Sequence, residues 1–385
     1  MTKAAPAALA LLLATTTAFA FDDGTLTIWT GSDRDREALL EAAAPFTEDL
    51  GIEVVVEIVD PDLPQKFQQA AATGDGPDIV LWAHDRFGEW ASGGLIQPVA
   101  PGEAWSSGIL PAAMEAVQFD GKTYGYPVAV EAVTLIYNTA LVDTPPAAFE
   151  DIAGMEIEGP KILWDYNNTY FTMPMLMAGG GYAFQKVDGS YDGSETGVNT
   201  DGAIAGAEVL KSLFDDGVMP QGVDYGVMEG AMNRGDVAMI LNGPWSWGAL
   251  EEAEIDFGIA PIPTVNGEVA PPFLGVLTLG INAATPNADL AVELIENYLA
   301  TDEGLAAWNA NGELGALADT SAAEAQDDPN VTGMLEAAAN GVPMPSNPEM
   351  GAFWAAMAPA LTNITTGTST PEEALNDAAA RILGE

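Results

Sequence analysis

Between Gly24 and Ala83, apolar runs alternate with stretches of helical spacing, and this alternation constrains the fold more than any other feature. Three apolar runs favour strands: TLTIW (25–29), IEVVVEIV (52–59) and DIVLW (78–82). Two stretches between them carry apolar residues at helical intervals: 32–51 and 64–74. Strands joined by helices pair in parallel, because each helix carries the chain back across the sheet. The sequence therefore predicts an α/β fold built on mostly parallel, doubly wound sheets.

Capping residues mark where several helices begin and end. We expect Ser32 to cap the first helix, with Asp35 three residues on and Gly51 as its stop. The last helix has the clearest signal, with Thr370 as cap and Glu373 completing a capping box.

The first twenty residues are predicted to be a secretory signal peptide (1–20). Lys3 precedes an apolar run around Leu9 to Leu13, and the segment ends in Ala18-Phe19-Ala20, a cleavage pattern. The run is too short for a stable membrane anchor, so we expect a soluble exported protein. The sequence has no cysteine, which excludes disulfides, thiolate metal sites, cysteine nucleophiles and a lipid anchor on cysteine. A protein without such an anchor needs a compartment to retain it, and the periplasm fits.

The charge of the chain is strongly acidic. It has 57 acidic against 11 basic residues and a net charge of −46, so it should repel nucleic acid and anionic lipid. We interpret the charge as an adaptation that keeps the protein soluble in salt, with cation binding as the alternative. The segment 187–197 partly imitates a calcium loop through Asp188, Ser190 and Asp192. Its twelfth position is Asn199 instead of the required Glu, so we predict no metal site.

Polar and aromatic side chains follow several predicted strands, at the point where each strand ends. The stretches are TLTIWTGSDR, IVLWAHDR, KILWDYNNTYF and VAMILNGPWSW, and Trp354 lies in MGAFWAAM. In doubly wound folds, ligands bind beyond the carboxyl ends of the strands. A single tryptophan is ordinarily a core residue, and Asp85 or Arg86 alone is ordinarily half of a surface ion pair. Their repetition after several strands favours one shared site.

This mixture of side chains suits a sugar. The apolar C–H face of a sugar ring packs on an aromatic ring, and its hydroxyl groups bond to carboxylates and to the arginine fork. Such a set is suited to holding a ligand and not to breaking it.

Catalysis has little support in the sequence. His84 is the only histidine and is predicted to be structural; we find no serine-hydrolase elbow, no Walker loop and no dinucleotide fingerprint, so we expect no cofactor. A glycoside hydrolase needs only two carboxylates, for which Asp33, Asp85 and Glu131 are available. This enzyme class stays open as an alternative.

Several motifs, taken in order along the chain, resemble those of the periplasmic maltose/maltodextrin-binding proteins, the solute-binding components of ABC sugar importers. The similarity runs from about Gly24 to Leu383. The most specific stretches are AATGDGPDIVLWAHDRFGEWASGGL, YGYPVAVEAVTLIYN, NGPWSW and MGAFW.

The resemblance implies a two-lobed fold with the sugar in the cleft between the lobes. It places residues 21–130 and 275–327 in an N-terminal lobe and residues 131–274 and 328–385 in a C-terminal lobe. It further implies a periplasmic monomer that binds maltose or maltodextrin, closes by a hinge motion and delivers the sugar to a membrane permease. A receptor for another disaccharide such as trehalose is the main alternative, and a secreted glucan hydrolase is a second.

The resemblance also implies roles for individual residues. The charged and polar ligand-binding candidates are Asp33, Arg34, Asp85, Arg86, Glu131 and Asn168. The aromatic and apolar candidates are Trp82, Tyr170, Phe171, Tyr225, Trp245, Met344 and Trp354. Several positions depart from the family pattern: Pro64 and Asn168 replace acids, Thr169 replaces a proline, and Ala358 replaces an arginine. These departures leave the class of ligand clearer than the sugar itself.

Overall fold

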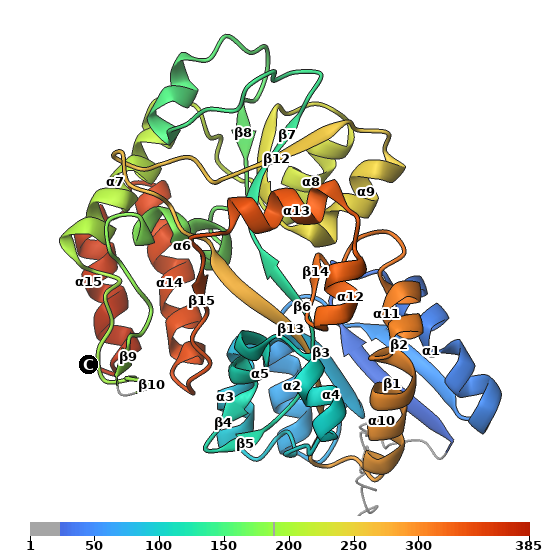
Figure 1. Cartoon of the computed structure of the whole chain (residues 1–385). Coiled ribbons are helices and arrows are strands. Elements are labelled where there is room, and N and C mark those ends of the chain that lie inside the picture. Colours follow the sequence, from blue (N-terminus) through green and yellow to red (C-terminus); the bar gives the residue numbers. More distant parts are fainter. Residues whose placement is uncertain (1–23, 188) are drawn as a thin grey trace, which may run out of the picture.

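The computed structural model describes residues 24–187 and 189–385. The predicted signal peptide and Asp188 lie outside the described residues. Figure 1 shows two lobes, one above the other, connected by strands that run from one lobe into the other. Within the described residues, we find no helix long and apolar enough to cross a membrane.

The larger sheet has seven strands, and most of it lies in the lower lobe of Figure 1. Its main path runs β14-β6-β13-β3-β1-β2, and β15 also pairs with β13. The strands are β1 (Thr25–Thr30), β2 (Glu53–Ile58), β3 (Ile79–Ala83), β6 (Tyr126–Ala132), β13 (Phe273–Ile281), β14 (Ala316–Leu317) and β15 (Val342–Pro343).

Helices cover both faces of this sheet. One apolar cluster joins it to α1 (Arg36–Leu50), α10 (Ala288–Leu294) and α11 (Asp302–Trp308). A second cluster joins it to α2 (Leu63–Ala72) and α3 (Phe87–Ser92). The lobe is therefore the three-layered arrangement that the β-α-β-α-β order predicts.

The upper lobe contains a sheet of four strands in the order β12-β7-β11-β8. The strands are β7 (Thr134–Asn138), β8 (Ile162–Leu163), β11 (Met239–Asn242) and β12 (Phe257–Ala260). The helices that share its apolar core are α6 (Thr169–Met177), α7 (Asp201–Asp215), α8 (Tyr225–Asn233), α9 (Trp247–Glu252), α13 (Pro329–Ala337), α14 (Met350–Thr365) and α15 (Pro371–Ile382). In segment 187–197, which partly imitates a calcium loop, β10 (Ser190–Tyr191) pairs antiparallel with β9 (Lys186–Val187).

The expected two-lobed α/β fold is confirmed, but the expectation of mostly parallel sheets is wrong in detail. Strands β1, β2 and β3 pair in parallel, whereas β13 is antiparallel to both β3 and β6. In the upper sheet, β7 is antiparallel to β11 and β12. The reason is the connectivity: β6 leads out of the lower sheet towards β7, while β13 returns from β12, so these two strands run in opposite directions. The lobe boundaries drawn at 130/131 and 274/275 stay a prediction.

The first helix begins later than we predicted. Asp35, and not Ser32, is its N-cap, because Oδ1 of Asp35 accepts the N–H groups of Glu37 and Ala38 at 2.9 and 3.1 Å. The predicted stop at Gly51 is confirmed, and this glycine has a positive φ of 68°. The late start leaves residues 31–34 free of the helix, as a loop at the end of β1.

Candidate functional site

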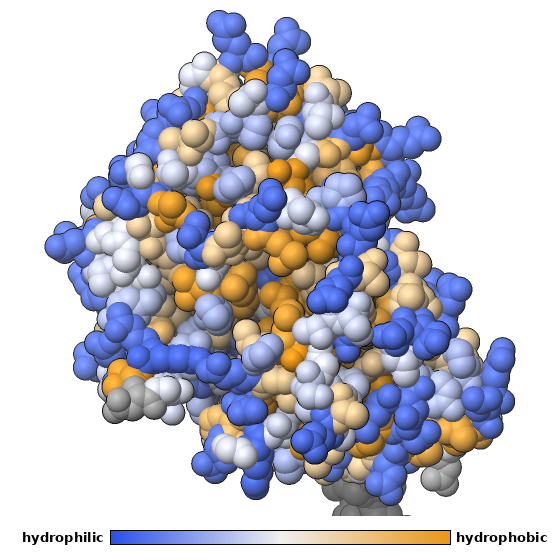
Figure 2. Space-filling view, in the orientation of Figure 1, coloured by the Kyte–Doolittle hydropathy of each residue, from blue (hydrophilic) through white to orange (hydrophobic). Residues whose placement is uncertain are grey.

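The candidate site lies where the ends of β1 and β3 face the upper lobe. Apolar residues gather across the middle of the face shown in Figure 2, with hydrophilic residues above and below. The structure brings together most of the predicted binding residues in this region, and they come from both lobes.

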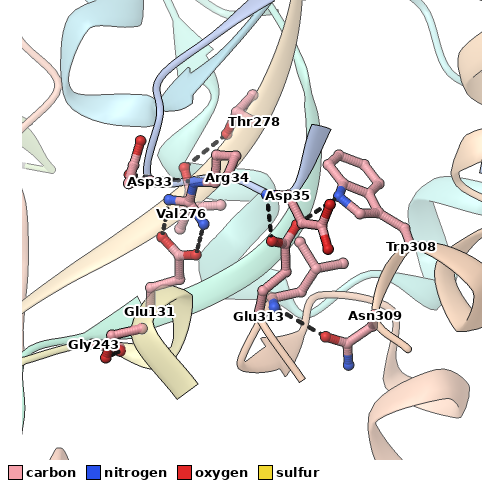
Figure 3. A network of polar contacts seen from close by, with 12 residues as sticks. Asp33, Arg34, Asp35, Glu131, Gly243, Val276, Thr278, Trp308, Asn309 and Glu313 are labelled. Atoms are coloured by element: carbon pink, nitrogen blue, oxygen red, sulfur yellow. Dashed lines mark hydrogen bonds and ion pairs between the residues drawn. The ribbon is translucent and has the colours of Figure 1, made fainter. Parts of the chain in front are cut away.

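A buried ion pair forms the centre of the site. The guanidinium of Arg34 donates two hydrogen bonds to the carboxylate of Glu131, at 2.5 and 2.9 Å, and the two side chains are 9% and 4% exposed. Asp33 lies 3.5 Å from Nε of Arg34 and is 33% exposed. Figure 3 shows Arg34 reaching from the loop after β1 to Glu131 on β6, with Asp33 beside the guanidinium.

The electrostatics of this centre favour a fixed charge on Arg34. Burial alone would lower the pKa of Arg34, but the carboxylates of Glu131 and Asp33 together raise it above its ordinary value. Burial raises the pKa of Glu131, and Arg34 opposes that rise. Asp33 is the carboxylate of this group with the most solvent access, which leaves it free to accept bonds from a ligand.

An aromatic wall from the upper lobe stands against these charges. The ring of Trp245 lies 5.7 Å from the guanidinium carbon of Arg34, within the range of a cation–π contact. Ring centroids of Tyr170 and Phe171 lie 6.2 and 6.3 Å from Trp245, and Phe171 lies 6.2 Å from Tyr225. Trp245, Tyr170 and Tyr225 are half-buried, so they keep surface for contact with a ligand.

Met344 and Trp82 lie close to two glycines of the lower sheet and its loops. The position that a Cβ would occupy at Gly275 is 3.4 Å from Cε of Met344 and 3.5 Å from the hydroxyl of Tyr170. The corresponding position at Gly31 is 3.7 Å from the ring of Trp82. Met344 and Tyr170 therefore lie close to β13, and Trp82 lies close to the end of β1.

Asp85 and Trp354 join the two lobes directly. The indole N–H of Trp354 on α14 donates to Oδ2 of Asp85 at 2.7 Å, although 269 positions separate the two residues. Burial raises the pKa of Asp85 to about 6, while Arg86 and the Trp354 bond oppose that rise. Asp85 is 4% exposed and Arg86 is 5% exposed, so neither belongs to a surface ion pair.

Arg86 and Asn168 make local contacts. Arg86 donates to Glu89 on the following helix at 2.6 Å. The side chain of Asn168 is exposed and caps α6 by accepting the N–H of Tyr170 at 3.2 Å. Their roles in binding stay predictions, and the same holds for the consequences of Pro64, which is buried in the first turn of α2, and of half-buried Ala358.

His84 has a structural position, as predicted. Its Nδ1 accepts the N–H of Val276 at 3.0 Å, so Nε2 carries the proton and donates to the carbonyl of Met344 at 3.0 Å. Burial lowers the pKa of His84 to about 4. The neutral ring thus ties β3 to β13 and to the segment that carries Met344.

Two residues near the aromatic wall were missed by the sequence analysis. Asn242, at the end of β11, is fully buried, and its side chain lies at the hydroxyl of Tyr225. Glu229 accepts from the same hydroxyl at 3.2 Å. Asn242 follows an apolar strand directly, so the rule that found Trp245 also applies to it; Glu229 lies within a helix and has no such signal.

The raised pKa of Asp85 leads to a pH prediction. Because the folded value is raised, the carboxyl contributes stability below its unfolded pKa, and this contribution is lost as pH rises through about 6. Asp85→Asn is therefore expected to raise the free energy of unfolding at pH 8 by on the order of 1–2 kcal/mol, with no difference at pH 4.

Urea unfolding at the two pH values measures this difference. Asp377→Asn is the matched control, since Asp377 and its partner Arg381 are 57% and 56% exposed, and it should change stability by less than about 0.5 kcal/mol. A variant at Asp85 that is less stable than wild type at pH 8 would contradict the buried, charged state of this carboxyl.

Comparison with known proteins identifies the relatives of the chain. A family model described as bacterial extracellular solute-binding protein matches residues 41–333. A galactooligosaccharide-binding protein of Bacillus subtilis (strain 168) is 28% identical over 382 residues, covering 94% of this chain and 89% of that protein. A maltotriose-binding protein of Pyrococcus abyssi (strain GE5 / Orsay) is 30% identical over 332 residues, covering 81% of this chain and 71% of that protein. The maltodextrin-binding protein MdxE of Bacillus subtilis (strain 168) is 28% identical over 352 residues, covering 85% of this chain and 82% of that protein. The chain belongs to the family of bacterial extracellular solute-binding proteins.

Proposed function

We propose that this protein is a non-catalytic receptor for maltose and short maltodextrins, which it delivers to the membrane permease of an ABC importer. The observation that carries the proposal is the aromatic wall of Tyr170 and Trp245 placed against the charges of Arg34 and Asp33. Aromatic faces match sugar rings, and the charged groups match their hydroxyls. The names of two relatives, maltotriose-binding and maltodextrin-binding, agree with this chemistry.

Binding is proposed to close the two lobes around the sugar. Hinge closure around a ligand is known for periplasmic binding proteins in general, and it requires the sugar to contact the closed state better than the open one. Here the aromatic rings come from one lobe and Asp33 and Arg34 from the other, so a sugar between them gains contacts only when both are near. We propose a periplasmic monomer, in keeping with the predicted signal peptide and the absence of cysteine.

The hydrolase alternative has weaker support. Both carboxylate oxygens of Glu131 accept bonds from Arg34, and Asp85 accepts a bond from Trp354. Two of the three carboxylates considered for catalysis are therefore occupied in binding other side chains. The relatives' names give the trehalose alternative no support, while one of them favours galactooligosaccharides as a second ligand to be tested.

Tryptophan fluorescence of the purified protein tests the proposal. We expect a saturable response to maltose or maltotriose, since two of the nine tryptophans, Trp82 and Trp245, line the proposed site. Trehalose and a galactooligosaccharide are titrated beside them, and reducing ends are measured after incubation with maltodextrin. A response to the galactooligosaccharide or trehalose alone, or the appearance of new reducing ends, would contradict the proposed ligand or the absence of catalysis.

A further inference from the structure

We propose that Glu313 is a positioning residue for sugar binding, which holds the loop carrying Asp33 and Arg34 in its binding geometry. This inference rests on the proposed function for its ligand. Glu313 lies between α11 and β14, is 3% exposed, and accepts a hydrogen bond from Asp35, the residue after Arg34. Figure 3 shows Glu313 beneath Asp35, on the same side of the loop as Glu131.

The carboxylate of Glu313 connects the loop to the lobe core. Oε2 accepts the backbone N–H of Asp35 at 2.6 Å, and Oε1 accepts the indole N–H of Trp308 at 3.0 Å. Trp308, the donor of the second bond, is fully buried, so this bond ties the carboxylate to the packed core of the lobe. The residue that follows Arg34 is thereby fixed to α11 by two charge-assisted bonds.

Neighbouring side chains fix Glu313 and Asp35 further. Asn311 donates from Nδ2 to Oδ2 of Asp35 at 2.7 Å, and its Oδ1 accepts the N–H of Glu313 at 3.3 Å. Asp35 uses its other oxygen to cap α1. The loop therefore has one firm end at the helix cap, and the bonds to Glu313 and Asn311 set the position of that end.

The charge of Glu313 also acts on the site. The negative charge of Glu313 favours the positive charge of Arg34, and the carboxylate of Asp35 repels that of Glu313. Trp308 and Asn311, which also neighbour Glu313, are neutral. Burial raises the pKa of Glu313 to about 7, and the bond from Asp35, together with Arg34, opposes that rise. Protonation near neutral pH would occupy one oxygen with hydrogen and remove its attraction for Arg34.

Glu313→Gln tests the role, because glutamine keeps the shape but presents an N–H₂ group to one of the two N–H donors. Glu296→Gln is the matched control: Glu296 is in the same lobe and accepts the hydroxyl of Tyr126 at 2.7 Å, away from the loop. At pH 8 we expect Glu313→Gln to weaken maltotriose binding about 5- to 10-fold and Glu296→Gln to leave it unchanged. The thermal midpoint of Glu313→Gln should not fall at pH 8, because a buried charge has been removed.

Two further readouts separate positioning from a merely structural role. Wild-type affinity should fall as pH decreases through about 7, and this step should be absent in Glu313→Gln. Amide hydrogen exchange without sugar should accelerate at residues 32–36 in Glu313→Gln and not in Glu296→Gln. If no sugar binds to wild type, the proposed function fails, and the exchange experiment still decides whether Glu313 holds the loop. Unchanged exchange, or unchanged affinity where wild type binds, would overturn the proposal.

Discussion

Glu131→Ala is expected to lower the free energy of unfolding by about 3 kcal/mol, because it leaves the guanidinium of Arg34 buried without its main partner. The two side chains are only 9% and 4% exposed, so water cannot replace the lost carboxylate. Asp33, at 3.5 Å, compensates part of the charge, which places the expected loss at the lower end for a broken buried pair. Urea unfolding at pH 7 measures the change.

Two comparisons give this prediction its controls. The double variant Arg34→Met with Glu131→Met should recover most of the loss, because it removes both buried charges while keeping the volume filled. Glu115→Ala breaks an ion pair with Lys186 in which both side chains are well exposed, so it should cost less than about 1 kcal/mol. A loss below about 1 kcal/mol for Glu131→Ala would mean that the pair is solvated in solution and that the site is more open than the structure shows.

Trp245→Ala is expected to weaken maltotriose binding by tenfold or more. Tenfold corresponds to about 1.4 kcal/mol, which the loss of about 60 Å² of apolar contact suffices to explain. The ring also holds Arg34 by its cation–π contact and supports Tyr170, so its removal loosens both sides of the site. Trp82→Ala is expected to have an effect of similar size, from the lower lobe.

The matched control is Trp105→Ala. Trp105 is also half-buried, but it packs on Tyr126 at the opposite end of β6 from Glu131, with ring centroids 5.4 Å apart. The Trp105→Ala variant should be less stable than wild type but bind maltotriose with unchanged affinity. The Trp245→Phe variant should retain part of the maltotriose affinity. Identical titration curves for wild type and Trp245→Ala would show that the sugar binds elsewhere.

The sequence predicted the local parts of this structure well, because their causes are local. The capping box of Thr370 and Glu373 is present as expected, and the strand ends after Trp29 and Trp82 carry the site. The first helix cap was misassigned because Ser32 and Asp35 have similar capping chemistry. The backbone N–H of Asp35 is also held by Glu313, which lies 278 positions further along the chain.

The contacts between residues far apart in the chain could not be predicted, because local sequence patterns do not encode them. Nothing in the stretch NGELG indicates that Glu313 lies under the loop of Arg34, and the bond between Asp85 and Trp354 likewise joins distant segments. The directions of β6 and β13 depend on the path of the chain between lobes, which periodicity does not reveal. The resemblance to sugar-binding proteins predicted the two lobes and the site residues together, and the contacts supplied their geometry.

A crystal structure of the protein with maltotriose tests the central claim most directly. The account predicts sugar rings between the lobes, packed on Trp245 and Tyr170, with hydroxyls bonded to Asp33. Sugar bound at another surface, or lobes that stay apart with an empty site at saturating maltotriose, would contradict it.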